Sequence, residues 1–308
     1  MADDLRVLLG ERRYQVVRPF GGVGLLRGIS AVCVRSDGAV CVLQRSQPPV
    51  MVLDTDGTVV DAFGWGVVAD GHGIAAALSG GVWVVDRDAH ELLEFAPDGG
   101  VVRRVGTRHH PRNAAPFNHP AAVAQAAGGQ LYVADGYGNN HVHVLSADGA
   151  HLHTWGGDGT DPAGLVTPHG IVVDTNGCIL VADREGDRVQ RYAPEGAWLG
   201  SLEGLYKPMD LAVDRDGGVI VSDQVPSLVR FGAEGTRTGR GRAAASAGHG
   251  IDIAVDGTIY IAEPPPVDRI TQLRPLSVVG SDDGCPTTGR HERAAGRDRT
   301  APAQEEAS

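Results

Sequence analysis

Three histidines occur in the same short motif at widely separated points of the chain. The motif is His-Gly-Ile, found at His72-Gly73-Ile74, His169-Gly170-Ile171 and His249-Gly250-Ile251. Imidazole is a common ligand of zinc and of other transition metals, and three imidazoles leave one position of a tetrahedral ion open, as in catalytic zinc sites. The motif therefore predicts a catalytic metal site, provided that the fold brings the three side chains to one point.

The histidine motif is part of a longer repeat. Six segments begin with an aliphatic residue in a short strand, continue through a Gly-containing turn, and reach a second strand that mostly ends in an acid. Their aliphatic anchors lie about 40 to 49 residues apart, the length of one four-stranded propeller blade: Val32, Ile74, Val123, Ile171, Leu211 and Ile251. Recurrent Asp-Gly and Asn-Gly pairs are typical of the hairpin turns in such blades. The sequence predicts an all-β fold, a six-bladed β-propeller.

Alignment of the blades predicts that the histidines converge. The residue two positions before each anchor is, in chain order, Ser30, His72, Ala121, His169, Met209 and His249. Histidine therefore occupies this position in every second blade. The innermost strands of a propeller line its central channel, so equivalent residues of alternate blades meet on the axis. A chance distribution of turn residues would not give this alternation, and we expect a three-histidine metal site.

The repeat pattern also predicts the domain organisation. Residues 1–13 form an N-terminal segment, residues 14–280 form the propeller, and residues 281–308 form a polar, disordered C-terminal tail. The strand around Tyr14-Gln15-Val16-Val17 precedes the first full repeat, so we expect it to close the ring by pairing with the last blade.

Further candidate residues follow the second strand of three blades. In an antiparallel meander this strand ends beside the start of the first, so Arg45, Tyr137 and Arg184 are expected on the same face as the histidines. Two cations and a phenol beside an open metal indicate an anionic substrate and a proton transfer. The alternatives are arginines that pair with surface acids and a tyrosine that only packs over the channel. Arg87 occupies the same position in its blade, with no role assigned.

Other polar residues are predicted to be structural or exposed. Because acids recur at the end of the second strand, a structural role in the turns is expected for Asp86, Asp135, Asp183 and Asp223. Solvent exposure is expected for His109, His110, His141, His143, His151 and His153.

Composition limits the remaining possibilities. The 308 residues carry a net charge of −11, which argues against nucleic acid as a partner. No apolar run is long enough to span a bilayer, and residues 1–13 lack the apolar core of an export signal. The four cysteines do not form a disulfide framework or a metal-type pair, so a cytoplasmic location is expected. The oligomeric state stays open.

Several segments resemble a known family. They include Phe117-Asn118-His119-Pro120, the run Val133-Ala134-Asp135-Gly136-Tyr137-Gly138-Asn139, Thr167-Pro168-His169-Gly170-Ile171 and Val181-Ala182-Asp183-Arg184-Glu185. These resemble NHL repeats of the bacterial relatives of peptidyl-α-hydroxyglycine α-amidating lyase, and the similarity extends from about Leu26 to Glu263. The resemblance implies a lyase that cleaves the N–Cα bond of a peptide ending in α-hydroxyglycine, giving an amide and glyoxylate.

The resemblance also implies roles for individual residues. It implies zinc ligands at His72, His169 and His249, a catalytic tyrosine at Tyr137 and active-site arginines at Arg45 and Arg184. Val32 and Ile74 match positions whose backbone oxygens bind calcium in the family, whereas the calcium-binding aspartate is replaced by Gly250, so the calcium site is incomplete.

Three functions remain open from the residues alone. The first is the lyase reaction just described, on a peptide or small molecule with a carboxylate. The second is another metal-dependent lyase or hydrolase of a small carboxylated hydroxy compound. The third is a non-enzymatic NHL scaffold that binds a protein partner, which the alternating histidines disfavour because a scaffold needs no axial metal.

Overall fold

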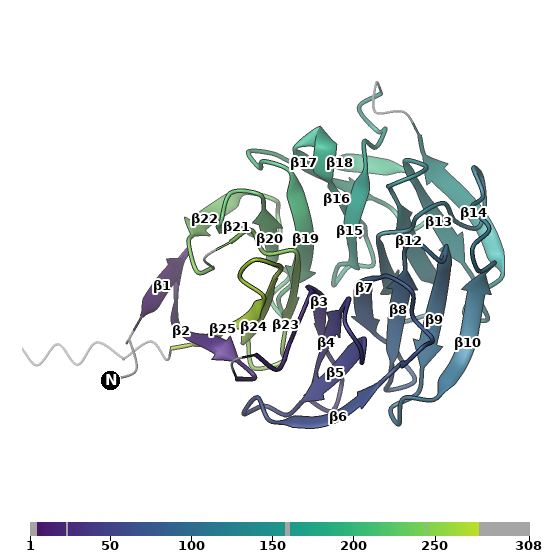
Figure 1. Cartoon of the computed structure of the whole chain (residues 1–308). Helices are drawn as coiled ribbons and strands as arrows, with labels where there is room; N and C mark the ends of the chain where they lie inside the picture. Colours follow the sequence, from purple (N-terminus) through teal and green to yellow (C-terminus); the bar gives the residue numbers. More distant parts are fainter. Residues whose placement is uncertain (1–4, 23, 158–160, 245, 277–308) are drawn as a thin grey trace, which may run out of the picture. The chain divides into compact units, whose positions relative to one another are not determined.

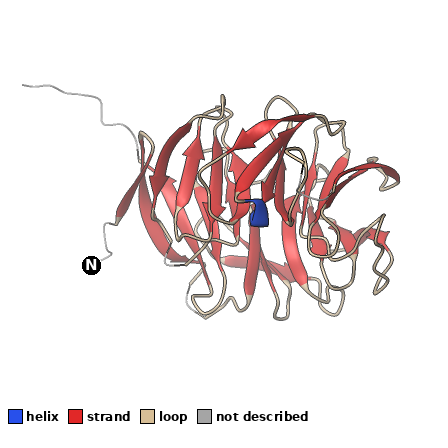
Figure 2. Ribbon diagram, turned by 90° about the horizontal axis from the view of Figure 1, so that it is seen from above, coloured by secondary structure: helices blue, strands red, loops and turns tan. Residues whose placement is uncertain are grey.

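Six antiparallel sheets are arranged around a central axis, as the sequence predicts (Figure 1). The computed structural model describes residues 5–22, 24–157, 161–244 and 246–276. Seen at right angles to this view, the described part is built almost entirely of strands joined by short loops (Figure 2). The predicted all-β six-bladed propeller is confirmed.

Each blade contributes strands at four successive distances from the axis. The innermost strands are β3 (Ile29–Val34), β7 (Gly71–Ala76), β11 (Ala122–Gln125), β15 (Pro168–Val173), β19 (Pro208–Val213) and β23 (Gly250–Ile253). The second strands are β4 (Val40–Gln44), β8 (Val82–Asp86), β12 (Leu131–Asp135), β16 (Ile179–Asp183), β20 (Val219–Asp223) and β24 (Ile259–Glu263). The third strands are β5 (Val50–Leu53), β9 (Glu91–Phe95), β13 (His141–Leu145), β17 (Arg188–Tyr192), β21 (Leu228–Phe231) and β25 (Arg269–Pro275). The outermost strands of blades one to five are β6 (Val59–Phe63), β10 (Val101–Gly106), β14 (His151–Gly156), β18 (Trp198–Leu202) and β22 (Arg237–Gly241).

The ring is closed by strands from both ends of the described residues. In blade six, β2 (Arg12–Phe20) pairs with β25, with Tyr14 opposite Pro275 and Val16 opposite Leu273. The predicted closure by the N-terminal strand is confirmed. The structure differs at the boundary: β1 (Arg6–Leu9) pairs with β2 as a fifth strand, so part of the expected N-terminal segment 1–13 belongs to blade six.

The hydrophobic core lies between neighbouring blades. All five residues of β4 are buried, because Cys41 and Leu43 pack toward blade two while Val40 and Val42 pack toward blade six. Alternating residues of a strand point to opposite faces, so a strand covered on both faces needs a continuous apolar run. The second strands of the other blades show the same complete burial.

The acids that end the second strands have the structural role expected of them. The Asp135 carboxylate accepts the backbone N–H of Asn118, and Asp86, Asp183 and Asp223 accept N–H groups of the loops that lead into their own blades. Two expectations about histidine are wrong, because His141 is half-buried and His143 is buried. His143 is fully buried, and both of its ring nitrogens have partners inside the blade. Its Nε2 lies 3.0 Å from Asp135 and its Nδ1 lies 2.8 Å from Thr154 Oγ1. These bonds attach strand β14 to the interior of blade three.

The expected tail, residues 281–308, lies outside the described residues. No helix in the described ranges has the length and apolar character needed to cross a membrane.

Candidate metal centre

A local irregularity of the innermost strands aims the histidines at the axis. The register between β7 and β8 passes from Gly71–Asp86 to Gly73–Val85, so His72 has no partner in the ladder. The register between β15 and β16 skips His169 in the same way. Such a β-bulge re-aims the extra side chain. His249 lies immediately before β23 and donates its backbone N–H to the Ala262 carbonyl oxygen.

The glycine that follows each histidine allows the next blade to approach. A Cβ atom at Gly73 would lie 2.5 Å from the carbonyl oxygen of Ala121, and one at Gly250 would lie 2.8 Å from the Ala31 Cα. At Gly170 it would lie 2.8 Å from the Cα of Asp210. Real Cβ contacts are longer than this, so the His-Gly-Ile motif combines a metal-ligand candidate with close packing between blades.

Each imidazole is oriented by the backbone of the next blade. The Nδ1 atoms of His72, His169 and His249 lie 2.8, 2.7 and 2.7 Å from carbonyl oxygens of Ala121, Met209 and Ser30, respectively. A carbonyl oxygen only accepts hydrogen bonds, so each Nδ1 carries the proton and each Nε2 keeps its lone pair. This is the arrangement that supports metal-binding histidines in known sites.

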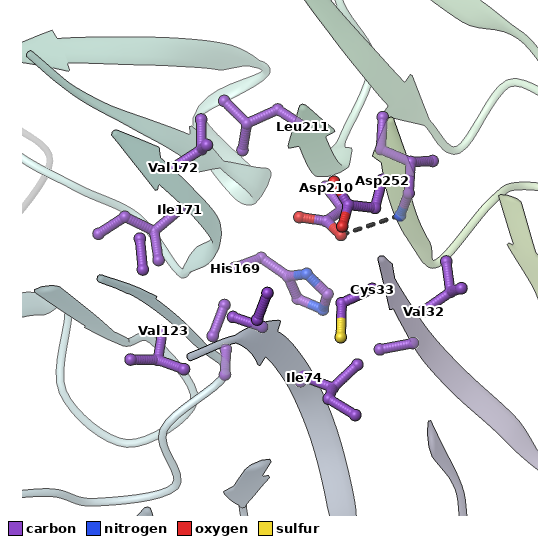
Figure 3. Close-up of a pocket in the computed structure, with 18 of the residues that line it drawn as sticks. Val32, Cys33, Ile74, Val123, His169, Ile171, Val172, Asp210, Leu211 and Asp252 are labelled. Carbon is purple, nitrogen blue, oxygen red and sulfur yellow. Dashed lines mark hydrogen bonds between the residues drawn. The ribbon is translucent and has the colours of Figure 1, made fainter. Parts of the chain in front are cut away.

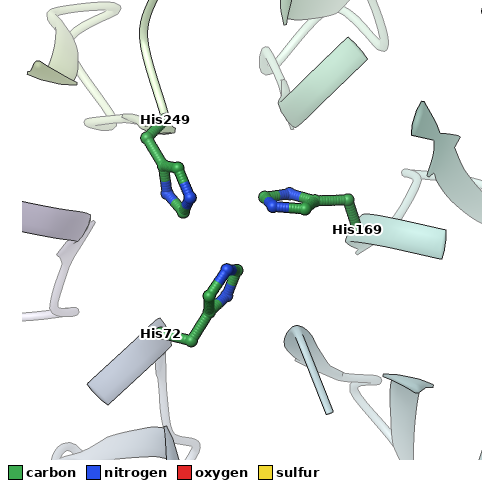
Figure 4. Close-up of side chains that lie close together, drawn as sticks. All are labelled: His72, His169 and His249. Atoms are coloured by element: carbon green, nitrogen blue, oxygen red, sulfur yellow. The ribbon is translucent and has the colours of Figure 1, made fainter. Parts of the chain in front are cut away.

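The three rings meet at one point (Figure 4). Their centroids are 4.8 to 5.0 Å apart, and one nitrogen from each ring lies within 4.8 Å of the others. Within the described ranges this is the one cluster of at least three histidine, cysteine or acidic side chains suited to hold a metal ion. Burial lowers the pKa of all three imidazoles, that of His249 to about 4. The rings are therefore neutral near pH 7, as a metal ligand must be.

The hydroxyl of Tyr137 lies beside two of the three histidines. Its oxygen is 3.0 Å from Nε2 of His72 and 3.0 Å from Nε2 of His169. Nη1 of Arg184 donates a hydrogen bond to the same oxygen at 3.1 Å, and the guanidinium carbon lies 5.1 Å from the ring centroid. The structure therefore brings two of the three candidates that follow the second strands into direct contact with each other and with the histidines.

Arg45 is paired with an acid. Its Nε forms an ion pair with Asp70 at 3.4 Å, and 43% of its side chain is exposed. Asp70 also pairs with Nη2 of Arg87 at 2.8 Å, and the guanidinium carbon of Arg87 lies 5.3 Å from the centroid of the Tyr137 ring. Sequence reasoning assigned Arg87 no role. The available signal was its position directly after the second strand, which is also that of Arg184.

The three histidines and the innermost strands line a cavity of about 300 Å³ (Figure 3). Val32 and Ile74, the residues linked to calcium by resemblance, both line it. Asp210 and Asp252 also line it, and their Oδ2 atoms accept the backbone N–H groups of Ile251 and Val34 at 3.0 and 2.7 Å. Burial raises the pKa of Asp210 to about 7 and that of Asp252 to about 6. Calcium binding stays a prediction.

Comparison with known proteins agrees with this architecture. Residues 117–145 and 165–192, which form most of blades three and four, match the NHL repeat. The chain is a six-bladed β-propeller with NHL repeats in blades three and four.

Two kinds of curated relatives are similar to this chain. Human NHL repeat-containing protein 3 is 30% identical over 221 residues, which are 66% of this chain and 59% of the human protein. A probable peptidyl-alpha-hydroxyglycine alpha-amidating lyase of Caenorhabditis elegans is 26% identical over 249 residues, 74% of this chain and 70% of the worm protein. A Drosophila melanogaster protein of that name, numbered 2, is 28% identical over 46% of this chain and 35% of its own length. The resemblance seen in the sequence is therefore also found in comparison with curated proteins named as amidating lyases.

Solved structures share the fold at low identity. A streptogramin B lyase superimposes with a TM-score of 0.65 at 13% identity, covering 85% of this chain and 98% of the lyase. A gluconolactonase from Xanthomonas campestris gives 0.66 at 16% identity, covering 89% of this chain and 96% of that chain. At these identities the similarity establishes the propeller alone.

Proposed function

We propose that this NHL propeller is a metal-dependent carbon–nitrogen lyase that cleaves an α-hydroxyglycine-type substrate into an amide and glyoxylate. The observation that carries the proposal is the Tyr137 hydroxyl, which lies within hydrogen-bonding distance of two imidazoles of the candidate metal centre and of Arg184. Relatives named as amidating lyases support a lyase of this type.

The three histidines fit a zinc ion. Their Nδ1 atoms are engaged by carbonyl oxygens, their Nε2 lone pairs remain, and their low pKa values keep them neutral. A zinc ion held there would supply Lewis acidity beside the substrate hydroxyl or carboxylate. Three protein nitrogens with an open position are typical of catalytic rather than structural zinc.

Tyr137 is the proposed base. An α-hydroxy amide breaks down when its hydroxyl loses a proton: the oxygen electrons form the aldehyde of glyoxylate, the N–Cα bond breaks, and the nitrogen takes up one proton. The Tyr137 oxygen receives the hydroxyl proton, and the Arg184 hydrogen bond stabilises the phenolate form of the tyrosine. Arg45 or Arg184 is the proposed partner of the substrate carboxylate.

A second reaction fits the same contacts. The side chains at the centre could bind a hydroxyl and a carboxylate of a substrate. None of the described side chains there selects a particular acyl group on the substrate. The alternative is therefore another metal-dependent lyase or hydrolase of a small carboxylated hydroxy compound. An assay that follows glyoxylate separates the two, because only the first reaction releases it.

Metal analysis and glyoxylate release test the proposal. We expect purified protein to hold about one zinc or similar divalent ion per chain and to release glyoxylate from an N-acyl-α-hydroxyglycine. His169→Ala should lose most of the metal and the activity, whereas His153→Ala, an exposed histidine on β14, should keep both. Full metal content in a His72→Ala, His169→Ala double variant would contradict the three-blade centre.

A further inference from the structure

A third arginine lies with Arg45 and Arg184 at the end of the central channel next to Tyr137, which is the mouth of the channel. Arg87 directly follows β8 of blade two, and its guanidinium carbon lies 5.3 Å from the Tyr137 ring centroid, close to the 5.1 Å of Arg184. Blades one, two and four thus each present an arginine here, while blade three presents the tyrosine. The position of Arg87 is that of a ligand-facing group rather than of an outer surface residue.

The head group of Arg87 is held in place by two acids. Nη2 pairs with Asp70 at 2.8 Å and Nε with Asp88 at 2.9 Å, and only 23% of the side chain is exposed. Among the described residues, no hydrogen bond or ion pair engages its Nη1. A fixed guanidinium with an unused donor loses little entropy when it binds a carboxylate.

Asp70 joins Arg87 to Arg45. Its Oδ2 pairs with Arg87 and its Oδ1 with Arg45 at 3.4 Å, so one half-buried carboxylate orients two guanidinium groups. Arg184 has a different partner, because its Nη1 donates to the Tyr137 hydroxyl. Arg184 therefore contacts the proposed base, whereas Arg45 and Arg87 share the acid Asp70.

We propose that Arg87, with Arg45 on the other side of Asp70, receives the substrate carboxylate, and that Arg87 determines the preference for anionic substrates. The identity of that substrate rests on the proposed lyase function, whereas the binding of a carboxylate at Arg87 does not. Arg184 then serves mainly the tyrosine, and Asp70 is a positioning residue for the arginine pair.

Binding of an inert carboxylate tests Arg87 without turnover. The probes are N-benzoylglycine, which has the carboxylate and lacks the reactive hydroxyl, and its uncharged amide, N-benzoylglycinamide. Calorimetry measures both with metal-loaded native protein, Arg87→Gln, Arg87→Lys, Asp70→Asn and the control Arg104→Gln. Arg104 lies on β10, the outermost strand of the same blade, and pairs with Glu91 at 2.8 Å, so its loss removes an arginine and an ion pair away from the mouth.

We expect Arg87→Gln to weaken binding of the acid about tenfold or more and to change binding of the amide about twofold or less. Arg87→Lys should restore part of the loss, because it keeps the charge without the planar fork. Asp70→Asn should also weaken the acid selectively, Arg104→Gln should change neither ligand, and all variants should keep the native metal content.

Three outcomes would overturn the inference: native protein that binds acid and amide equally, Arg87→Gln protein that loses the same factor for both, or acid binding unchanged by the substitution. Failure of the lyase proposal has a different signature. Native protein would then release no glyoxylate from N-benzoyl-α-hydroxyglycine, while binding of N-benzoylglycine would still depend on Arg87.

Discussion

At the scale of single residues, Tyr137 has the environment of a reactive group. Three polar atoms from His72, His169 and Arg184 surround its oxygen, yet 37% of the residue is exposed. A tyrosine that served only packing would bury its ring and leave its hydroxyl to solvent. Here the hydroxyl points to the histidines and the exposed part is open to a ligand.

We expect Tyr137→Phe to keep the fold and the metal and to lower turnover by about two orders of magnitude or more, because proton transfer by a positioned side chain contributes that much. Glyoxylate release and metal content measured on the same preparation check this expectation. Turnover close to that of the native protein would reduce Tyr137 to a packing role.

The residue scale also shows how far a sequence reveals a site. The three histidines were predictable because one alignment of six repeats shows them in alternate blades. Tyr137 and Arg184 were predictable because the end of a second strand lies beside the start of the first. Arg87 occupies the same kind of position, but its ion pairs and its approach to the tyrosine depend on side-chain rotamers that no spacing encodes. Burial of His143 was missed because its partner Asp135 lies on the neighbouring strand.

At the scale of elements, the innermost strands bond to one another through side chains. Asp210 of β19 accepts the N–H of Ile251 in β23, and Asp252 of β23 accepts the N–H of Val34 in β3. These carboxylates bridge neighbouring blades at a cost, because burial raises the pKa of Asp210 from 3.8 to about 7.

The sign of this shift gives a pH prediction. A carboxyl whose pKa is higher in the folded than in the unfolded state contributes most to stability below its unfolded pKa of 3.8, and that contribution is lost as the pH rises through about 7. Asp210→Asn keeps an acceptor for Ile251 and carries no charge. We expect it to raise the free energy of unfolding at pH 8, by on the order of 1 kcal/mol, and to have less effect at pH 4.

Denaturant unfolding of native and variant protein at both pH values provides the measurement, and the difference between the two proteins removes the contribution of the histidines. A variant that is less stable than the native protein at pH 8 would show that the carboxylate is needed in its charged form.

At the scale of the whole molecule, the ring holds only while the N-terminal strands β1 to β3 stay joined to the C-terminal strands β23 to β25, and this contact is the seam of the ring. Strand β2 pairs with β25, and Leu9, Tyr14 and Val16 enter the core cluster shared by blades five and six. The repeat pattern predicted this closure, while β1 was missed because its four residues precede any repeat.

Two truncations separate the contributions of these strands. Removal of residues 1–10 deletes β1 and should lower the melting temperature by several degrees. Removal of residues 1–20 also deletes β2 and exposes β25, so it should abolish cooperative unfolding. Thermal unfolding followed by circular dichroism distinguishes the two. Native-like melting of the longer truncation would mean that the seam is held by other contacts.

The orientation of the histidines has a further consequence. Each imidazole takes its direction from a carbonyl group of the next blade, and the bond from His249 to Ser30 spans the seam. In a protein that binds the proposed ion, a molecule that opens there would lose the alignment of one ligand and with it most of its affinity for the ion. Metal binding and ring closure are then linked equilibria. A metal titration therefore measures the fraction of molecules whose ring is closed, and added ion shifts open molecules toward the closed state.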